Sequence, residues 1–280
     1  MSSTRIECDS LGKKTVPNKS YYGIQTLRGL ENFPITGTPI SSYPIFIKAL
    51  ALVKKSAARA NNELGQLDSK LAGPIDKACN EILAGKLLNE FCCDILQGGG
   101  GTTANMNANE VIANRALEIM GQPKGNYDIL NPNNHVNMGQ STNDAYPTAI
   151  RVALHLMLEK LLGQMEIIRN ALSGKGDEFK EVIKLGRTEL QDAVPMTLGQ
   201  EFEAYSLLVD EDMRQVKYSQ NLIVEINLGA TAIGTGINAH PGYAELVAKY
   251  LAEFSSVPVY TAPNLIEATQ DCGGDRKSVV

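Results

Sequence analysis

The sequence predicts a mainly α-helical protein, in which a small N-terminal helical domain is followed by the first part of a long-helix bundle. Apolar residues recur at steps of three and four over most of the chain after Pro44, which is the helical period. Two of these runs are long enough for helices of about 30 Å or more. The strict alternation that marks half-buried strands is almost absent. A hydrophobic content of 43% in 280 residues allows a sizeable core.

The bulk composition excludes several classes of partner. A formal net charge of −5 argues against a basic nucleic-acid-binding surface, so we expect no nucleic-acid partner. No segment reaches the roughly 20 uncharged apolar residues of a membrane span, and the N-terminus lacks a signal-peptide core, so we expect no membrane partner and a cytoplasmic location. The five cysteines and three histidines lack metal-ligand spacing, which predicts reduced thiols, no metal site and no cofactor.

The first 139 residues predict the smaller domain. Residues 1–43 are rich in turn formers and predict an extended arm that lies on other structure. A helical pattern begins near Pro44. One face of the next predicted helix carries four apolar residues: Leu71, Ile75, Ala78 and Ile82. A further helix follows the glycine run 98–101 and ends near Gly121.

The second domain is predicted to span residues 140–280 and to begin near Gly139 with a long helix. Ser141 and Asp144 form a capping-box pattern at its start, and Pro147 is tolerated in its early turns. Its apolar seam has seven members: Ile150, Leu154, Met157, Leu161, Met165, Ile168 and Leu172. A seam of this length requires partner helices in a bundle.

A second long helix follows Pro195, with Thr197 and Gln200 as its capping box. Its seam has six members: Leu198, Phe202, Tyr205, Val209, Met213 and Val216. A shorter helix begins near Pro241 and ends near Ser255. Together with the first long helix, these elements predict an incomplete bundle.

Candidate functional residues gather in three stretches, 98–107, 140–144 and 186–192, each rich in small polar residues where a helix is expected to begin. A helix N-terminus offers unpaired backbone N–H groups and a positive dipole, which suit a carboxylate. Neutral hydroxyl and amide side chains add donors there without a fixed charge. Three such stretches in one chain predict a pocket for a small anion.

Simpler interpretations stand beside this one. The glycine run alone could be a slack connector, and residues 141–144 alone could be an ordinary N-cap. Four asparagines on one helix fit a buried hydrogen-bond network at least as well as ligand contacts: Asn105, Asn107, Asn109 and Asn114. Arg187 fits a structural ion pair better than catalysis, whereas Thr188 is the stronger functional candidate. His135, a lone loop histidine, is expected to have a structural role.

Several ordered motifs give the chain a family resemblance. They are YYGIQT at 21–26, GGGTTANMNANE at 99–110, NPNNHVN at 131–137, QSTNDAYPT at 140–148 and GRTELQDAVPMTLGQE at 186–201. Together they resemble the aspartase/fumarase superfamily over about residues 5–273. The sequences 141–143 and 193–195 are more similar to aspartate ammonia-lyases than to fumarases. Asn131 and Asn134 depart from the secondary dicarboxylate site that is usual in fumarases.

The resemblance implies reversible elimination of ammonia from L-aspartate to give fumarate. It assigns the substrate β-carboxylate to Thr102, Ser141 and Thr142, the α-carboxylate to Thr188, and the amino group to Asn143. The full set of predicted substrate-binding residues is Thr102, Thr103, Ser141, Thr142, Asn143, Thr188 and Glu189. Glu189 replaces a histidine common in the superfamily; it either favours aspartate over malate by attracting the ammonium group or pairs with Arg187 or another cation.

The resemblance also implies a longer chain and an oligomer. Family members carry a later Gly-Ser-Ser loop whose serine is the general base, so the catalytic residue is unknown here and is expected beyond the end of this chain. The match breaks off at 274–280, which suggests a C-terminally truncated sequence that is expected to be inactive alone. Family members are homotetramers. The alternatives are a class II fumarate hydratase and a non-catalytic fragment that retains the fold.

Overall fold

A computed structural model describes residues 3–270, and these form mainly helices, as the sequence predicts. Two compact units are present. The first runs to Ala153 and resumes at Val224, and the second is Leu154–Ile223. The division into domains 1–139 and 140–280, with a boundary near Gly139, stays a prediction. Residues 271–273, the end of the predicted family match, lie outside the described residues.

The first unit contains most of the secondary structure. Its elements are β1 (Thr4–Asp9), β2 (Gly12–Pro17), α1 (Ile24–Asn32), η1 (Ile40–Ser42), α2 (Pro44–Glu63), α3 (Ser69–Leu83), η2 (Leu88–Glu90), η3 (Gly99–Gly101), α4 (Thr102–Ile119), η4 (Pro132–Val136), β5 (Glu225–Ile226), α7 (Tyr243–Ser255), β6 (Tyr260–Thr261) and α8 (Leu265–Gln270). The long helix α5 (Thr142–Glu178) begins in this unit and continues in the second.

The core of the first unit forms around α2, which packs against α3, α4 and α7. Ile47 and Leu50 of α2 and Ile75 and Ile82 of α3 are fully buried, as the helical spacing predicts for α3. Helix α4 is unusual because every residue from 104 to 114 is buried. A helix enclosed on all sides must satisfy its polar side chains internally. The NH₂ groups of its four asparagines all have partners, whereas Oδ1 of Asn107 and Asn109 has none within the described residues.

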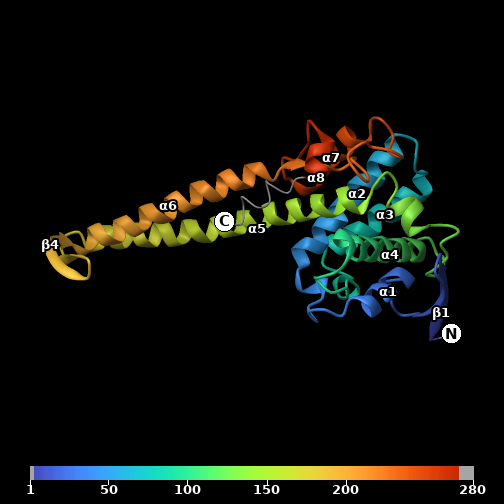
Figure 1. Cartoon of the computed structure of the whole chain (residues 1–280), viewed down its shortest axis with the longest axis horizontal. Coiled ribbons are helices and arrows are strands. Elements are labelled where there is room, and N and C mark those ends of the chain that lie inside the picture. The colour runs from blue at the N-terminus through green and yellow to red at the C-terminus, as the bar shows by residue number, and fades with distance from the viewer. Residues whose placement is uncertain (1–2, 271–280) are drawn as a thin grey trace. The chain divides into compact units, whose positions relative to one another are not determined.

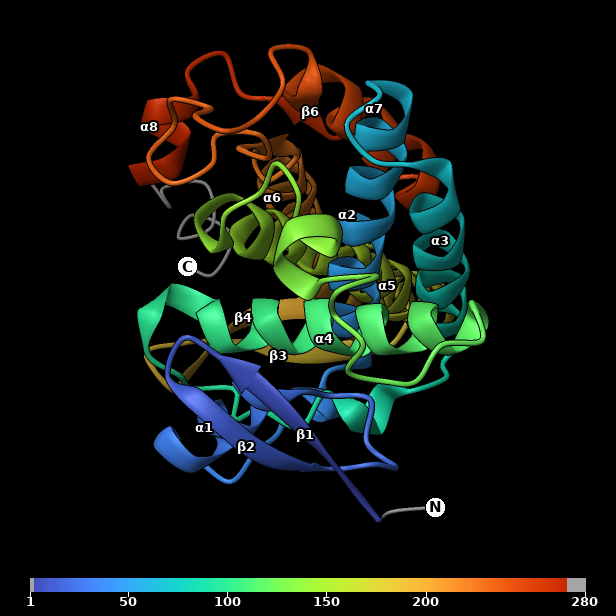
Figure 2. The same cartoon turned by 90° about the vertical axis from the view of Figure 1, so that its right-hand side faces the viewer.

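The N-terminal stretch forms a hairpin and a short helix where the sequence pattern predicted an extended arm. Strands β1 and β2 pair antiparallel, and both contact α1, which in turn packs on α4 (Figure 2). The Arg5 guanidinium holds the segment that follows by donating to the carbonyl oxygens of Pro17, Ser20 and Tyr22. Strands this short carry too little alternation to be recognised in the sequence.

The second unit is a helical hairpin built from the later part of α5 and from α6 (Leu198–Leu222), which run side by side (Figure 1). The Ser206 hydroxyl on α6 donates to the Arg169 carbonyl at 3.1 Å. Arg169 pairs with Asp210 at 3.3 Å. At the start of α6 the predicted capping box is present, because Thr197 accepts from Gln200 N while Gln200 accepts from Thr197 N.

One expectation about the second unit is wrong. Residues 186–192 do not begin a helix; they lie in the antiparallel hairpin of β3 (Ile183–Thr188) and β4 (Gln191–Thr197). Glu189 and Leu190 both have positive φ, at 50° and 64°, which is the geometry of a two-residue hairpin turn. Strand pairing satisfies this backbone, and the helix N-terminus forms instead at Thr197.

The long-helix seams are only partly covered within the described residues. On α6, Met213 is buried. On α5, by contrast, Met157, Leu161 and Ile168 are 47%, 46% and 54% exposed. Apolar side chains at this spacing remain available for further helices.

Candidate functional site

The N-termini of α4 and α5 lie together in the first unit. The Asn105 side-chain NH₂ on the first turn of α4 lies 3.2 Å from the hydroxyl oxygen of Thr142, the first residue of α5. Gly101, with φ of +97°, packs against the Tyr146 ring, and a Cβ at this position would come within 2.5 Å of the ring atoms. The glycine run therefore brings the two helix starts together, because only glycine combines that φ with so close an approach.

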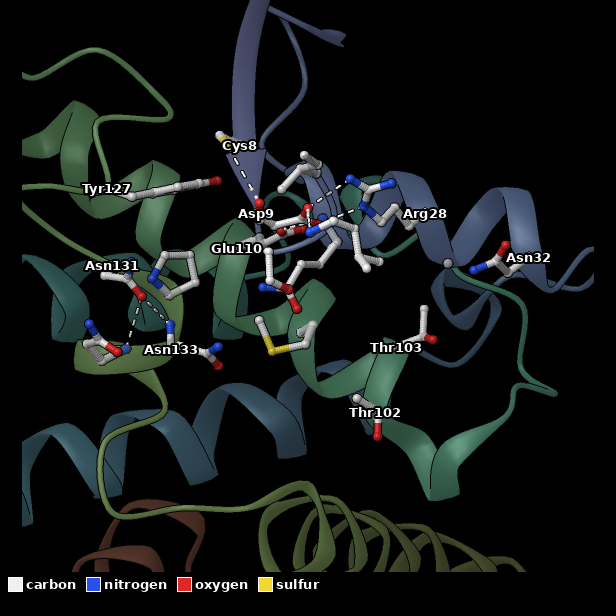
Figure 3. A pocket seen from close by; sticks show the side chains of 18 of the residues that line it. Cys8, Asp9, Arg28, Asn32, Thr102, Thr103, Glu110, Tyr127, Asn131 and Asn133 are labelled. Atoms are coloured by element: carbon white, nitrogen blue, oxygen red, sulfur yellow. Dashed lines mark hydrogen bonds and ion pairs between the residues drawn. The ribbon is translucent and has the colours of Figure 1, made fainter. Parts of the chain in front are cut away.

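A cavity of about 620 Å³ lies beside the start of α4 (Figure 3). Thr102 and Thr103 line one side of it, and the Asp9–Arg28 ion pair lines another. Arg28 binds both carboxylate oxygens of Asp9 at 2.7 and 2.8 Å, and the hydrogen bond from Arg28 is the main factor that lowers the pKa of Asp9. The arginine charge in this cavity is therefore already paired.

The two threonines play different structural roles. The Thr102 side chain is exposed, and its hydroxyl donates to the Gly99 carbonyl at 2.8 Å, closing the glycine turn. Thr103 is half-buried, and its methyl group lies so close to Gly29 that a Cβ there would approach it to 2.2 Å. Thr102 is therefore the more accessible of the two, and its hydroxyl can donate to a ligand only when it turns away from the Gly99 carbonyl.

The predicted residues at the start of α5 also face in different directions. Ser141 lines a small cavity of about 170 Å³, and its hydroxyl oxygen accepts from Asn143 N at 3.2 Å. The exposed Asn143 side chain donates to the Ala232 carbonyl at 2.7 Å. Thr142 is half-buried and accepts from Asn105. Two hydroxyls and one amide are thus gathered at a single helix start.

Asp144 anchors this helix start. One carboxylate oxygen accepts from Ser141 N at 2.9 Å, and the other accepts from Gly229 N and Thr231 N at 3.1 and 2.8 Å. Burial raises the pKa of Asp144 to about 6, although the backbone hydrogen bonds act in the opposite direction. Asp144, which was predicted only as a capping residue, therefore also binds the loop that contains Gly229 and Thr231.

Lys54 lies at the centre of a buried amide cluster that the sequence reasoning missed. Its ammonium nitrogen lies 2.7, 2.8 and 2.8 Å from the side-chain oxygens of Asn105, Asn137 and Gln140. Burial lowers the pKa of Lys54 to about 7, and the charge of Asp144 opposes this effect. The sequence carried a signal for its burial, because Lys54 stands on the apolar face of α2, four residues after Leu50, but it carried none for its partners.

The four asparagines of α4 are buried, as the network interpretation predicts. Asn107 donates to the Glu90 carbonyl, and Asn114 donates to the Tyr21 carbonyl and accepts from Gly125 N. Of these four side chains, only that of Asn105 is hydrogen-bonded to the side chain of a predicted substrate-binding residue. These asparagines therefore serve mainly to hold α4 in the core.

The other residues singled out in the sequence do not lie at the starts of α4 and α5. Thr188 and Glu189 lie in the second unit, where both are exposed. Arg187 pairs with Asp192 at 3.0 Å, and no ion pair of Glu189 is present within the described residues. His135 accepts from Asn131 N at 2.9 Å through Nδ1, which is the structural role expected for it.

Within residues 3–270, no group of three or more His, Cys, Asp or Glu side chains is placed to hold a metal ion. In the same part of the chain, no helix is both long and apolar enough to cross a membrane.

Comparison with known proteins decides the family. The model of the family described as lyase matches residues 12–274. The chain belongs to this lyase family. The match covers both helix starts, and it confirms the resemblance to the aspartase/fumarase superfamily.

Curated relatives of this lyase are named aspartate ammonia-lyase. The protein from Helicobacter pylori is 54% identical over 269 residues, which is 96% of this chain and 58% of the relative. The protein from Escherichia coli K12 is 50% identical over 273 residues, 97% of this chain and 57% of the relative. The chain thus spans less than two thirds of the length of these relatives.

Solved structures share the fold. A Brucella melitensis protein described as a fumarate lyase and delta crystallin, bound to cobalt, has a TM-score of 0.97 and 48% identity; the match covers 98% of this chain and 60% of that one. A class II fumarase from Schistosoma mansoni has a TM-score of 0.90 and 36% identity over 95% of this chain and 59% of that one. The fumarase-like fold predicted from the motifs is therefore confirmed.

Proposed function

We propose that this lyase takes part in the reversible elimination of ammonia from L-aspartate to give fumarate. The observation that carries the proposal is the meeting of two helix N-termini, where Asn105 contacts Thr142 at 3.2 Å beside other neutral donors. The proposal is also supported by relatives at 50–54% identity that are named aspartate ammonia-lyase.

The chemistry explains why such donors suit the reaction. The proton leaves Cβ of aspartate, which is weakly acidic because only a carboxylate activates it. The resulting carbanion is stabilised when its charge spreads into the β-carboxylate, so donors around those oxygens bind the transition state more strongly than the substrate. We assign this role to Thr102, Ser141 and Thr142, with Thr103 beside them.

The other end of the substrate needs a second set of contacts. We assign the amino group to Asn143. We assign the α-carboxylate to Thr188 and the attraction of the ammonium charge to Glu189, both supplied by another copy of the chain in the homotetramer proposed below. No general base is assigned among the described residues. We propose that the base lies in a segment that corresponds to the part of the relatives not matched by this chain.

We propose a homotetramer as the functional assembly. Support comes from Met157, Leu161 and Ile168 on α5 and Tyr205 on α6, which are all about half exposed. Apolar side chains repeated along one helix are typical of an interface with further helices. We also propose a cytoplasmic location, which agrees with the four described cysteines being free thiols.

A class II fumarate hydratase is the second candidate, favoured by the structural likeness to the Schistosoma mansoni enzyme. The two reactions share an anionic transition state but differ in the leaving group. Incubation of the complete gene product with L-aspartate and, separately, with L-malate distinguishes them. Ammonia release from aspartate supports the first candidate, and turnover of malate alone supports the second.

A further inference from the structure

The Thr142 hydroxyl has one hydrogen-bond contact within the described residues, and that contact comes from a chain of side chains that begins at Lys54. Lys54 Nζ lies 2.7 Å from Asn105 Oδ1, and Asn105 Nδ2 lies 3.2 Å from Thr142 Oγ1. Lys54 and Asn105 are 0% and 1% exposed. Solvent therefore does not compete for the Lys54–Asn105 contact, whereas Thr142 at the end of the chain is half-buried.

Lys54 fixes which end of each neighbouring amide faces it. An ammonium group has three N–H donors and no acceptor, so it binds only the oxygen end of an amide. Its three contacts are all with amide oxygens, at 2.7–2.8 Å, which matches the three N–H bonds of the charged form. The neutral amine that forms above about pH 7 would present its lone pair to one of these oxygens, so the three contacts are those of the charged form, which prevails below this pH.

The orientation of Asn105 then determines what Thr142 can do. With Oδ1 held by Lys54, the Asn105 NH₂ group points to Asn137 Oδ1 at 3.1 Å and to Thr142 Oγ1 at 3.2 Å. Thr142 thus acts as an acceptor toward Asn105, and its own O–H must point elsewhere. Within residues 3–270, no acceptor for that O–H is present besides solvent.

We propose that Lys54 and Asn105 are positioning residues that hold the Thr142 hydroxyl in its donor orientation toward a substrate carboxylate. This inference rests on the proposed function for the identity of the substrate. It does not depend on the reaction, because any carboxylate at this helix start requires a donor. Neither residue needs to touch the substrate.

The variant Asn105→Asp tests the inference with almost no change in shape. The carboxylate introduced at this position still accepts from Lys54, but its second oxygen replaces the NH₂ donor. Thr142 then donates inward to that oxygen, and the distance between the two oxygens is expected to be about 2.7 Å, shorter than the present 3.2 Å to the amide nitrogen. A crystal structure of the variant measures this distance, and an unchanged or longer distance contradicts the inference.

Kinetics on the complete gene product give the second readout. Asn105→Asp and Thr142→Val are each expected to lower kcat/KM roughly 100-fold, and the double variant is expected to be no worse than Thr142→Val alone. Fully additive losses would overturn the inference, because Asn105 would then act independently of Thr142. The matched control is Asn80→Asp, at an exposed amide that accepts from Lys55 Nζ at 2.6 Å, and it should leave the kinetics unchanged.

Neutron diffraction of the wild-type protein tests the same point without a variant. The Thr142 deuterium is expected to point away from Asn105; a deuterium pointing at Asn105 would overturn the inference.

Failure of the proposed function has a different signature. If the wild type converts malate and not aspartate, the assigned reaction is wrong, whereas the hydroxyl orientation and the double-variant comparison on malate still decide the inference.

Discussion

Asp144 Oδ2 lies 2.8 Å from the backbone nitrogen of Thr231, so the first turn of α5 is fixed to a loop 87 residues further along the chain. The same carboxylate oxygen accepts from Gly229 N. Both partners are backbone donors that are buried with it, and they cannot turn to water if the acceptor is lost. The position of the α5 start against this loop therefore depends on a single buried carboxylate.

Replacement of Asp144 by asparagine should destabilise the protein by about 2–4 kcal/mol, because an NH₂ group would face backbone N–H donors. Urea unfolding monitored by circular dichroism measures the change. The exposed Asp177 lies on the same helix, and Asp177→Asn should change the free energy of unfolding by less than about 0.5 kcal/mol. Equal effects of the two substitutions would contradict the anchoring role.

The pH dependence of stability should carry the signature of Asp144. Burial raises its pKa from the ordinary value of 3.8 to about 6, so the native state holds a proton that the unfolded chain releases in this interval. The contribution of Asp144 to stability is thus largest below about pH 4 and is lost as the pH rises toward 6. Carboxyl-carbon NMR should give a midpoint near pH 6 for Asp144; an ordinary midpoint would contradict its burial.

Lys54 should change the pH dependence of stability between about pH 7 and 10.5. Its pKa is about 7 instead of 10.5, so between these values the unfolded chain binds a proton that the native state has released. Stability from this group therefore rises as the pH increases from 7 to 10.5. Nitrogen NMR of the lysine side chains measures the titration directly. A midpoint for Lys54 near the ordinary 10.5 would contradict the prediction.

Glu110 should be essential for the position of α1. Its buried carboxylate accepts from the backbone nitrogens of Gly23, Gln25 and Thr26 and from the Thr26 hydroxyl, at 2.6–3.0 Å. Glu110→Gln should cost about 2–3 kcal/mol and increase hydrogen exchange in α1, because one acceptor oxygen becomes a donor. Glu203→Gln, at an exposed site on α6, is the control. Unchanged hydrogen exchange in α1 of the Glu110→Gln variant would contradict the claim that Glu110 holds α1 in place.

Glu189 should influence substrate choice if the proposed reaction is correct. Glu189→Gln removes the charge that is proposed to attract the substrate ammonium, so the ratio of aspartate to malate turnover should fall about 3- to 10-fold. Steady-state kinetics on the complete gene product measure the ratio. An unaltered ratio would discard this role; Asp192→Asn, which breaks only the exposed Arg187 ion pair, should leave the ratio unaltered.

Much of the fold could be predicted from apolar spacing and capping residues. The buried face of α3 and the capping box of α6 follow from local patterns alone. The hairpin at residues 186–192 could not be predicted, because a strand pair that short is stabilised by backbone pairing and by a positive-φ turn at Glu189 and Leu190. Neither feature has a distinct signal in residue type.

In the candidate site, too, some features could be predicted from local sequence patterns and others could not. Ser141 and Asp144 were recognisable as a cap, and the hydroxyls beside them were recognisable as donors. The contribution of Lys54 was not, because its three amide partners come from segments 51 to 86 residues away. A buried charge depends on contacts that only the folded chain brings together.

The most direct test of the account is the reaction of the complete gene product with L-aspartate, followed by simultaneous measurement of fumarate and ammonia. We predict that the two products appear in equal amounts and that Thr142→Val lowers the rate by roughly 100-fold. Full activity of that variant, or no ammonia release by the wild-type protein, would contradict the claim that donors at the meeting helix starts bind the reacting carboxylate.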